Sequence, residues 1–332
     1  NRVRRQRQMC IRDRNYNGIE LLKEFIPKIV KYSTNSKLYL IDNCSSDKSV
    51  NYVEKNFSHI TIVKHAKNLG YAKAYNEGIK KIKEEILCLI NSDVLVTKNW
   101  TAPILNLFKK NDFISVIQPK IKDYYKKNYF EYAGAAGGFL DINGIPFCNG
   151  RLGYSCEKDL GQYNGNYEIT WASGACFFIR NKLFKDLNGF DESFFMHFEE
   201  IDICLRLKRN GYKIWYSGDA EVFHLGGSTL NYDNPKKLFF NIRNSLICYT
   251  KNLPILILLF VFISRLFIDF GLIIFFFFKL EIQQVKAIIK AYFSFVRNFN
   301  INFKKRDGTV NPLKLFSVIL NMNLFKNLHK KY

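Results

Sequence analysis

The feature that most constrains the fold is a regular alternation of strand-like and helix-like segments that begins at residue 15. Short apolar runs predict strands at 37–43, 60–65, 85–93 and 114–120. The segments between them have helical spacing, at 18–32, 45–57, 70–85 and 99–111. Strands that alternate with helices form a mostly parallel sheet flanked by helices. We therefore predict an α/β, Rossmann-like fold.

Polar residues end two of the predicted strands, and ligands of such sheets bind outside the carboxyl ends of the strands. Asp42 follows the run at 37–41, and Asn91 and Asp93 follow the run at 85–90. A carboxylate such as Asp93 can hold a hard divalent cation, although Asp at a strand end is also ordinary turn chemistry. Asp42 can accept the imide N–H of a uracil or thymine ring, or it can cap the following helix. We expect these side chains to line one crevice.

Three further segments carry chemistry and also admit a plain structural interpretation. A helix starts after Asn68-Leu69-Gly70, where backbone N–H groups favour an anion unless the glycine is only a packed turn. Acidic residues gather at 199–202, at the start of a helix predicted over 200–211. They can supply a general base, or they can form a solvated first turn. His224 stands before two glycines, either as a buried core residue or as a metal ligand.

The net charge of +21 is spread unevenly over the 332 residues. Residues 1–14 hold six Arg and one Asp, and residues 241–332 hold 14 Lys and Arg against three acids. The middle of the chain is close to neutral, which excludes an evenly basic nucleic-acid binder. Residues 1–14 match neither a strand nor an amphipathic helix. We predict an atypical basic N-terminus at 1–14 outside the fold, a catalytic domain at 15–240 and a helical, membrane-associated region at 241–332.

The apolar segment at 253–278 is long enough to span a bilayer core, at roughly 1.5 Å per residue against about 30 Å. Arg265 and Asp269 interrupt it at i and i+4 and can pair. Lysines and arginines flank both of its ends, which makes both ends cytoplasmic by the positive-inside rule. We predict a re-entrant or in-plane insertion, with an adjoining amphipathic helix at 283–299. A buried helical pair that covers the catalytic domain is the alternative. Several cysteines lie in apolar runs, which indicates buried, reduced thiols in a cytosolic protein.

The order and spacing of these motifs closely resemble glycosyltransferase family 2, and most closely its bacterial rhamnosyltransferase-like branch. The segments that carry the resemblance lie at 15–18, 41–47, 68–78, 90–94, 171–176, 189–207 and 224–229. The resemblance implies a GT-A fold, a nucleotide-sugar donor, Mg²⁺ or Mn²⁺ as cofactor, and inversion at the anomeric carbon.

The resemblance also implies roles for individual residues. Asp93 and His224 stand where the family holds its metal, and Glu200 stands at the general base, with Glu199 as the second candidate. Asp202 is expected to brace its helix. The positions that correspond to donor or acceptor contacts are Tyr16, Asn17, Asp42, Asn68, Gly70, Asn76, Asn91, Trp171 and Gly174.

These implications predict an inverting, metal-dependent glycosyltransferase that acts in cell-surface polysaccharide synthesis. Its donor is a nucleoside-diphosphate sugar, with rhamnose suggested by the branch, and its acceptor is a hydroxyl of a glycan or polyprenyl-linked glycan. We expect it at the cytoplasmic face of the cell membrane, peripheral or re-entrant. The alternative is a catalytically impaired nucleotide-sugar-binding or scaffold protein, because residues 1–14 lack the apolar first strand that the family has.

Overall fold

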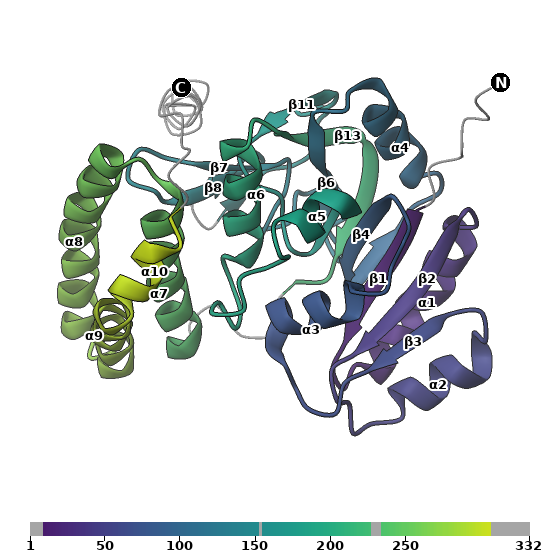
Figure 1. The fold of residues 1–332 in the computed structure, drawn as a ribbon, viewed down its shortest axis with the longest axis horizontal. Helices are drawn as coiled ribbons and strands as arrows, with labels where there is room; N and C mark the ends of the chain where they lie inside the picture. The colour runs from purple at the N-terminus through teal and green to yellow at the C-terminus, as the bar shows by residue number, and fades with distance from the viewer. Residues whose placement is uncertain (1–8, 153–154, 227–233, 307–332) are drawn as a thin grey trace.

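The computed structural model describes residues 9–152, 155–226 and 234–306, and Figure 1 shows a central sheet with helices on both faces. The sheet has nine strands in the order β11-β13-β6-β12-β4-β1-β2-β3, with β5 paired to β13. The strands are β1 Met9–Asn15, β2 Ser36–Asp42, β3 Thr61–Lys64, β4 Ile86–Asn91, β5 Val94–Val96, β6 Ile114–Asp123, β11 Asn166–Ile169, β12 Cys176–Arg180 and β13 Lys213–His224.

The sheet combines a parallel half with a mixed half. Strands β3, β2, β1 and β4 pair in parallel, as the alternating pattern predicts. Strand β12 then runs antiparallel between β4 and β6, and β13 is parallel to β6. Two small ladders lie outside this sheet, β7 Gly138–Leu140 with β8 Pro146–Cys148 and β9 Arg151–Leu152 with β10 Ser155–Cys156. The predicted α/β architecture is confirmed, and its second half is mixed rather than parallel.

Helices cover both faces because successive side chains of a strand point to opposite sides. On β4, Ile86, Cys88 and Ile90 join one buried cluster, whereas Leu87 and Leu89 join the other. The first cluster packs against α1 and α4, and the second against α3, α5 and α6. These helices are α1 Ile19–Tyr32, α2 Ser49–Asn56, α3 Gly70–Ile79, α4 Thr101–Lys110, α5 Asn181–Asp186 and α6 Glu199–Arg209.

Strand β1 corrects the prediction that residues 1–14 lie outside the fold. Residues 9–15 form a strand in the interior of the sheet, paired in parallel with β2 on one side and β4 on the other. Met9 and Cys10 are buried. The segment has charged residues at 12–14 and no apolar run, so its composition does not predict a strand. Backbone pairing with β2 and β4 holds it in the sheet. Residues 1–8 lie outside the described part of the chain.

Four helices follow the sheet and form the group at one side of Figure 1. They are α7 Pro235–Asn252, α8 Ile255–Phe278, α9 Ile282–Arg297 and α10 Phe299–Lys304. Asn234 caps α7 by accepting the N–H of Lys236 at 2.9 Å. The predicted domain boundary at 240/241 falls inside α7, which shares the core cluster of α6 through Leu246 and Ile247. Residues 307–332 of the predicted C-terminal region lie outside the described residues.

Candidate active site

The carboxyl ends of β1, β2 and β4 lie next to one another. Asn15 is opposite Asp42 in the ladder between β1 and β2, and residue 14 is opposite Asn91 in the ladder with β4. The Asn15 amide donates to Asp42 Oδ1 at 3.0 Å, and Asp42 Oδ2 accepts the N–H of Ser45 at 3.1 Å. The side chain of Asp42 is therefore buried and holds the loop after β2, while Tyr16 is half exposed beside it.

The loops that leave these strands are held by amide side chains. Asn17 Oδ1 accepts the N–H of Ser46 at 2.7 Å. Asn43 accepts the N–H of Leu69 and donates to Asn68 Oδ1, at 2.9 and 2.8 Å. Two of the predicted donor-site residues, Asn17 and Asn68, thus define the shape of the loops through these bonds.

The start of α3 fits closely against the segment before α6. Gly70 has φ +76°, and a Cβ at this position would lie 2.9 Å from the Phe195 side chain and carbonyl oxygen. Asn76 Nδ2 donates to the Phe190 carbonyl at 2.8 Å, and its Oδ1 accepts the N–H of Phe190 at 2.9 Å. Both polar groups of Asn76 therefore join α3 to this segment. These bonds give Asn76 a structural role.

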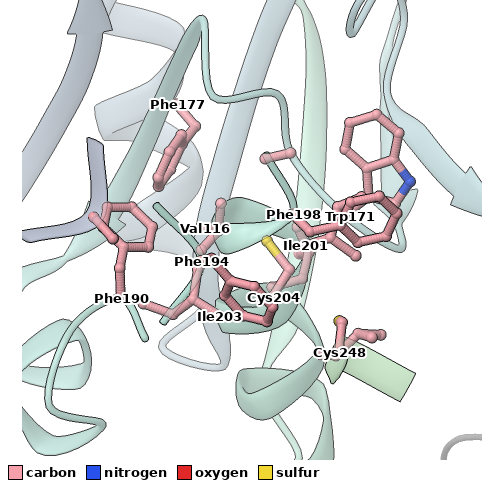
Figure 2. Close-up of a cluster of buried hydrophobic side chains, with 14 of the residues drawn as sticks. Val116, Trp171, Phe177, Phe190, Phe194, Phe198, Ile201, Ile203, Cys204 and Cys248 are labelled. Atoms are coloured by element: carbon pink, nitrogen blue, oxygen red, sulfur yellow. The ribbon is translucent and has the colours of Figure 1, made fainter. Parts of the chain in front are cut away.

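The side chain of Trp171 is buried in the core. It is 6% exposed, and its indole N–H donates to the Phe139 carbonyl at 2.8 Å. Figure 2 shows its ring beside Phe198 and Ile201, at the start of α6. The side chain of Trp171 thus packs in the interior, and the place of the segment with Trp171 and Gly174 toward the acceptor stays a prediction.

Asp93 and His224 come together beyond the end of β4. His224 Nε2 lies 3.2 Å from Asp93 Oδ1, because β13 pairs with β5 directly after Asp93. On its other side, His224 Nδ1 lies 3.4 Å from Glu131 Oε1. Glu131 is 3% exposed, and its second oxygen accepts the N–H of Ala133 at 2.6 Å. The structure thus brings the predicted residues Asp93 and His224 together, and it adds Glu131, which the sequence analysis missed.

The electrostatics of this group favour a cation. Burial lowers the pKa of His224, but the negative charges of Asp93 and Glu131 outweigh burial and hold that pKa well above its usual value. The same negative potential attracts a divalent ion, for which carboxylate oxygen and imidazole nitrogen are suitable ligands. Asn91 Oδ1 is buried with no hydrogen-bond partner in the described chain. Among the described residues, no three His, Cys, Asp or Glu side chains form a complete metal site.

Glu200 lies on the other side of the segment that leads into β12. The Asn91 N–H donates to the Ala175 carbonyl at 2.9 Å, which fixes this segment beside the end of β4. A Cβ at Gly174 would lie 3.7 Å from Glu200 Oε1, and the Tyr71 hydroxyl donates to the Gly174 carbonyl at 3.0 Å. Residues 174–175 therefore lie between Glu200 and the end of β4: Gly174 is next to Glu200, and Ala175 is bonded to Asn91.

The environment of Glu200 suits a proton acceptor. Burial raises its pKa to about 7, although backbone N–H groups at the helix start oppose the shift. Its Oε2 is shielded from solvent and has no hydrogen-bond partner among the described residues. A carboxylate with a pKa near neutrality can accept a proton efficiently at physiological pH. Glu199, the second candidate, is only 4% exposed.

The turn before α6 has an unusual backbone. His197 and Phe198 both have positive φ, at 66° and 75°, a conformation that costs non-glycine residues about 1–3 kcal/mol each. The buried side chain of Asn244 on α7 donates to the carbonyls of Met196 and His197, at 2.7 and 2.8 Å. A residue of α7 thereby fixes the turn that positions Glu200.

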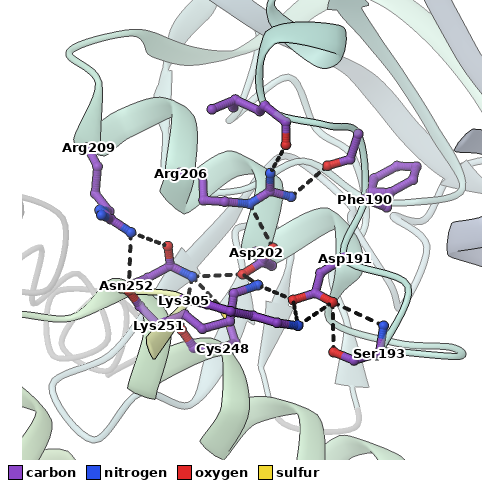
Figure 3. A network of polar contacts seen from close by, with 12 residues as sticks. Phe190, Asp191, Ser193, Asp202, Arg206, Arg209, Cys248, Lys251, Asn252 and Lys305 are labelled. Atoms are coloured by element: carbon purple, nitrogen blue, oxygen red, sulfur yellow. Dashed lines mark hydrogen bonds and ion pairs between the residues drawn. The ribbon is translucent and has the colours of Figure 1, made fainter. Parts of the chain in front are cut away.

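Asp202 braces α6, as predicted. It is fully buried and accepts hydrogen bonds from Arg206, Lys251 and Asn252, each at 2.8 Å. Lys251 also bonds Asp191 at 2.6 Å, and Figure 3 shows how these side chains join α6 to α7. Ionic contacts of a residue in its first turn therefore fix the helix that carries Glu200 to α7.

A family model described as "Glycosyl transferase family 2" matches residues 15–188. The chain belongs to glycosyltransferase family 2. The match includes Asp42, Asn91 and Asp93 and ends before Glu200 and His224, of which His224 lies beside Asp93 in the structure.

Relatives and solved structures agree with this membership. A Mycobacterium tuberculosis protein named N-acetylglucosaminyl-diphospho-decaprenol L-rhamnosyltransferase is 24% identical over 200 residues, 56% of this chain and 65% of that protein. The chain spans less than two thirds of the length of the curated relatives it matches.

Two solved structures share the GT-A-like fold. S. aureus TarS 1–349 in complex with UDP-GlcNAc has a TM-score of 0.57 at 16% identity, over 86% of this chain and 81% of that chain. The mannosyltransferase PcManGT from Pyrobaculum calidifontis, in complex with GDP-Man and Mn2+, has a TM-score of 0.53 at 11% identity, over 97% of this chain and 82% of that chain. At these identities the likeness shows the fold alone.

Proposed function

We propose that this family 2 member is an inverting glycosyltransferase that moves a sugar from a nucleoside diphosphate to an acceptor hydroxyl. The observation that carries the proposal is the approach of His224 Nε2 to Asp93 Oδ1, at 3.2 Å, beside the segment that contacts Glu200. The solved structures of TarS and PcManGT contain UDP-GlcNAc and GDP-Man, which supports a nucleotide-sugar donor.

A divalent cation fits the proposed site. Asp93 and His224 would hold it, and Asn91 offers a buried amide oxygen without a hydrogen-bond partner in the described chain. Two protein ligands leave coordination positions for the donor diphosphate, and the ion would neutralise the charge that develops on the leaving group. The Mn2+ in the PcManGT complex supports this choice of cofactor. Glu131 would orient His224 from its far side.

Glu200 supplies the acid–base chemistry in this proposal. A single displacement inverts the anomeric carbon and needs one base, which removes the proton of the attacking hydroxyl. Glu200 can serve because it combines a pKa of about 7 with a place next to Gly174. The alternative of an impaired binding or scaffold protein rested on a missing first strand, and β1 fills that position.

The substitution Glu200→Gln tests the base. We expect kcat to fall by about 10²–10⁴-fold because proton removal is lost, while the dissociation constant of the donor stays within about twofold. Full activity in Glu200→Gln would remove this residue from the role. The parallel variant Glu199→Gln tests the second candidate, and a loss of kcat there with full activity in Glu200→Gln would transfer the role to Glu199.

The same base predicts a pH dependence. The charged form of Glu200 accepts the proton, so wild-type kcat should rise about tenfold per pH unit below pH 7 and level off above it. Initial rates between pH 5.5 and 8.5 measure this profile. A kcat that falls as the pH rises through 7 would contradict the assignment.

We propose a rhamnosyl donor and a polyprenyl-linked glycan acceptor, at the cytoplasmic face of the membrane. The name of the mycobacterial relative, with its decaprenol-linked acceptor and L-rhamnosyl group, supports both choices. Metal-dependent hydrolysis of a panel of nucleotide sugars tests the donor. We expect the fastest release of nucleotide from dTDP-rhamnose and little release by an Asp93→Ala variant, and faster release from another sugar would replace rhamnose.

A further inference from the structure

One face of the α8–α9 pair is apolar and uncovered. Helix α8 is the one helix of the described chain that is long and apolar enough to cross a membrane by composition, and 22% of its most apolar window is buried. We call the following exposed side chains the apolar face: Leu256, Leu259, Phe260, Ile263, Leu266, Phe267, Phe270, Ile274, Phe275 and Phe278 of α8, with Ile289, Phe293 and Val296 of α9. Soluble monomers rarely expose so large a continuous patch.

The charged residues of α8 point away from this face. Arg265 and Asp269 pair at 3.1 Å and are 8% and 1% exposed, as the i, i+4 spacing predicts. The Tyr292 hydroxyl of α9 donates to Asp269 at 2.7 Å, so the ion pair is enclosed between the two helices. The charges that interrupt the segment therefore place no polar group on the apolar face.

The inner side of α8 packs against the rest of the protein. Leu258 and Val261 are buried, and a Cβ at Gly144 would lie 3.1 Å from Val261 Cγ1 and 2.8 Å from the Tyr249 ring. Tyr249 of α7 donates its hydroxyl to the Gly144 carbonyl. A helix that lies along the catalytic domain in this way cannot be surrounded by lipid, so only its outer side is available to a bilayer.

Basic side chains accompany the apolar face. The exposed basic residues of α9 and of the helix ends on either side of it are Lys279, Lys286, Lys290, Arg297 and Lys304. Glu281 is the one exposed acid in the same stretch, 279–304. Apolar side chains with interleaved lysine and arginine match the interface of an anionic bilayer, where the chains enter the acyl boundary and the cations meet phosphate groups. A second protein copy with the same charge would be repelled.

We propose that the apolar face docks in the plane of an anionic lipid bilayer, with α8 inserted on one side and not spanning it. The catalytic domain then stays on the same side of the membrane as both ends of α8. This inference goes beyond the proposed glycosyl transfer, and its test needs neither donor nor acceptor. A failure of lipid binding is therefore distinguishable from a failure of the proposed reaction.

The test is co-sedimentation of the full chain, purified in mild detergent and diluted with vesicles. We expect at least tenfold tighter binding to vesicles with 30% phosphatidylglycerol than to pure phosphatidylcholine. The double variant Phe267→Gln/Phe270→Gln should lose binding at least tenfold. The matched control, Phe113→Gln/Leu160→Gln, changes exposed apolar residues of the catalytic domain, at 65% and 78% exposure, and should bind as wild type does. Equal loss in both variants overturns the proposal.

Two further measurements exclude other arrangements. The charge-reversal variant Lys286→Glu/Lys290→Glu should remove the preference for anionic vesicles, and an unchanged preference would contradict the role of the basic residues.

For the orientation, a Leu280→Cys variant in vesicles is treated with an impermeant maleimide–polyethylene glycol, with the exposed Cys44 as an internal reference. Labelling at both cysteines supports in-plane docking, whereas protection of residue 280 until detergent is added shows a spanning helix and overturns it.

Light scattering in detergent tests the remaining occupant, a second copy. We expect a monomer in both the wild type and Phe267→Gln/Phe270→Gln. A wild-type dimer that this variant dissociates would assign the apolar face to self-association and overturn the lipid proposal.

Discussion

At the scale of single residues, the arrangement around His224 depends on Glu131, whose Oε1 lies 3.4 Å from His224 Nδ1. Asp93 and Glu200 could be predicted from the sequence, because a polar residue after an apolar strand and acidic residues at a helix start are local patterns. Glu131 has no such signal, since it lies in a loop after β6 and reaches His224 only through the fold. Trp171 also lies in a local motif, and its ring is buried in the core.

Glu131 therefore carries the first prediction. Glu131→Gln should weaken the apparent affinity for Mn²⁺ by about 10–100-fold, because a carboxylate behind a metal-bound histidine orients the imidazole and increases its basicity. Titration with Mn²⁺, followed by the loss of the free-ion signal in electron paramagnetic resonance, measures this. Glu168→Gln is the control, because Glu168 pairs with Lys208 away from His224. Equal affinities in both variants would contradict the orienting role.

At the scale of elements, the helix at 199–209 was predicted almost to its ends, but the turn that leads into it was not. A helix start follows from acids in the first turn and apolar spacing, which are local. The positive φ angles of His197 and Phe198 instead depend on Asn244, which is more than 40 positions away. Strand β1 was missed for a related reason, because pairing on both edges outweighs its polar composition.

The turn leads to the second prediction. Asn244→Ala should lower kcat more than it raises the KM of the donor, because the turn that orients Glu200 loses both donors while the donor-binding loops stay intact. Two partly buried carbonyls that lose these hydrogen bonds should also lower the free energy of unfolding by about 1 kcal/mol each. Ser245→Ala is the control, since Ser245 bonds only within its own helix. A purely structural role would predict lower stability with an unchanged kcat in the folded fraction.

At the scale of the whole molecule, composition separated a basic, apolar C-terminal region from a catalytic domain, whereas the structure joins them. Lys251 of α7 lies between Asp191 and Asp202, and Lys305 adds a second cation to Asp191 at 2.9 Å (Figure 3). These partners are about 50 to 110 positions apart in sequence, so no local pattern predicts the ion pairs. A region that composition separates from the catalytic domain thus fixes the helix that carries Glu200.

This network carries the last prediction. Lys251→Met should lower the free energy of unfolding by about 1.5–3 kcal/mol, because Asp191 and Asp202 lose their shared cation and keep only Lys305 and Arg206. Lys182→Met breaks the exposed pair with Asp186 and should cost less than about 1 kcal/mol. Urea unfolding, followed by circular dichroism at pH 7, measures both variants. A similar loss in the two would contradict a stabilising role for the buried network.

The pH dependence of stability gives this prediction a second readout. Burial raises the pKa of Asp191 and of Asp202, but the neighbouring cations outweigh burial and hold both pKa values below their usual range. Such carboxylates stabilise the fold above the pKa of the unfolded chain, about 3.9, and lose that contribution as the pH falls below it. Wild-type stability should therefore decrease steeply between about pH 4 and 2, and less steeply in Lys251→Met, whose two carboxylates have lost one of the cations that lower their pKa. A parallel decrease in the two proteins would show that Lys251 does not set the charge state of this network.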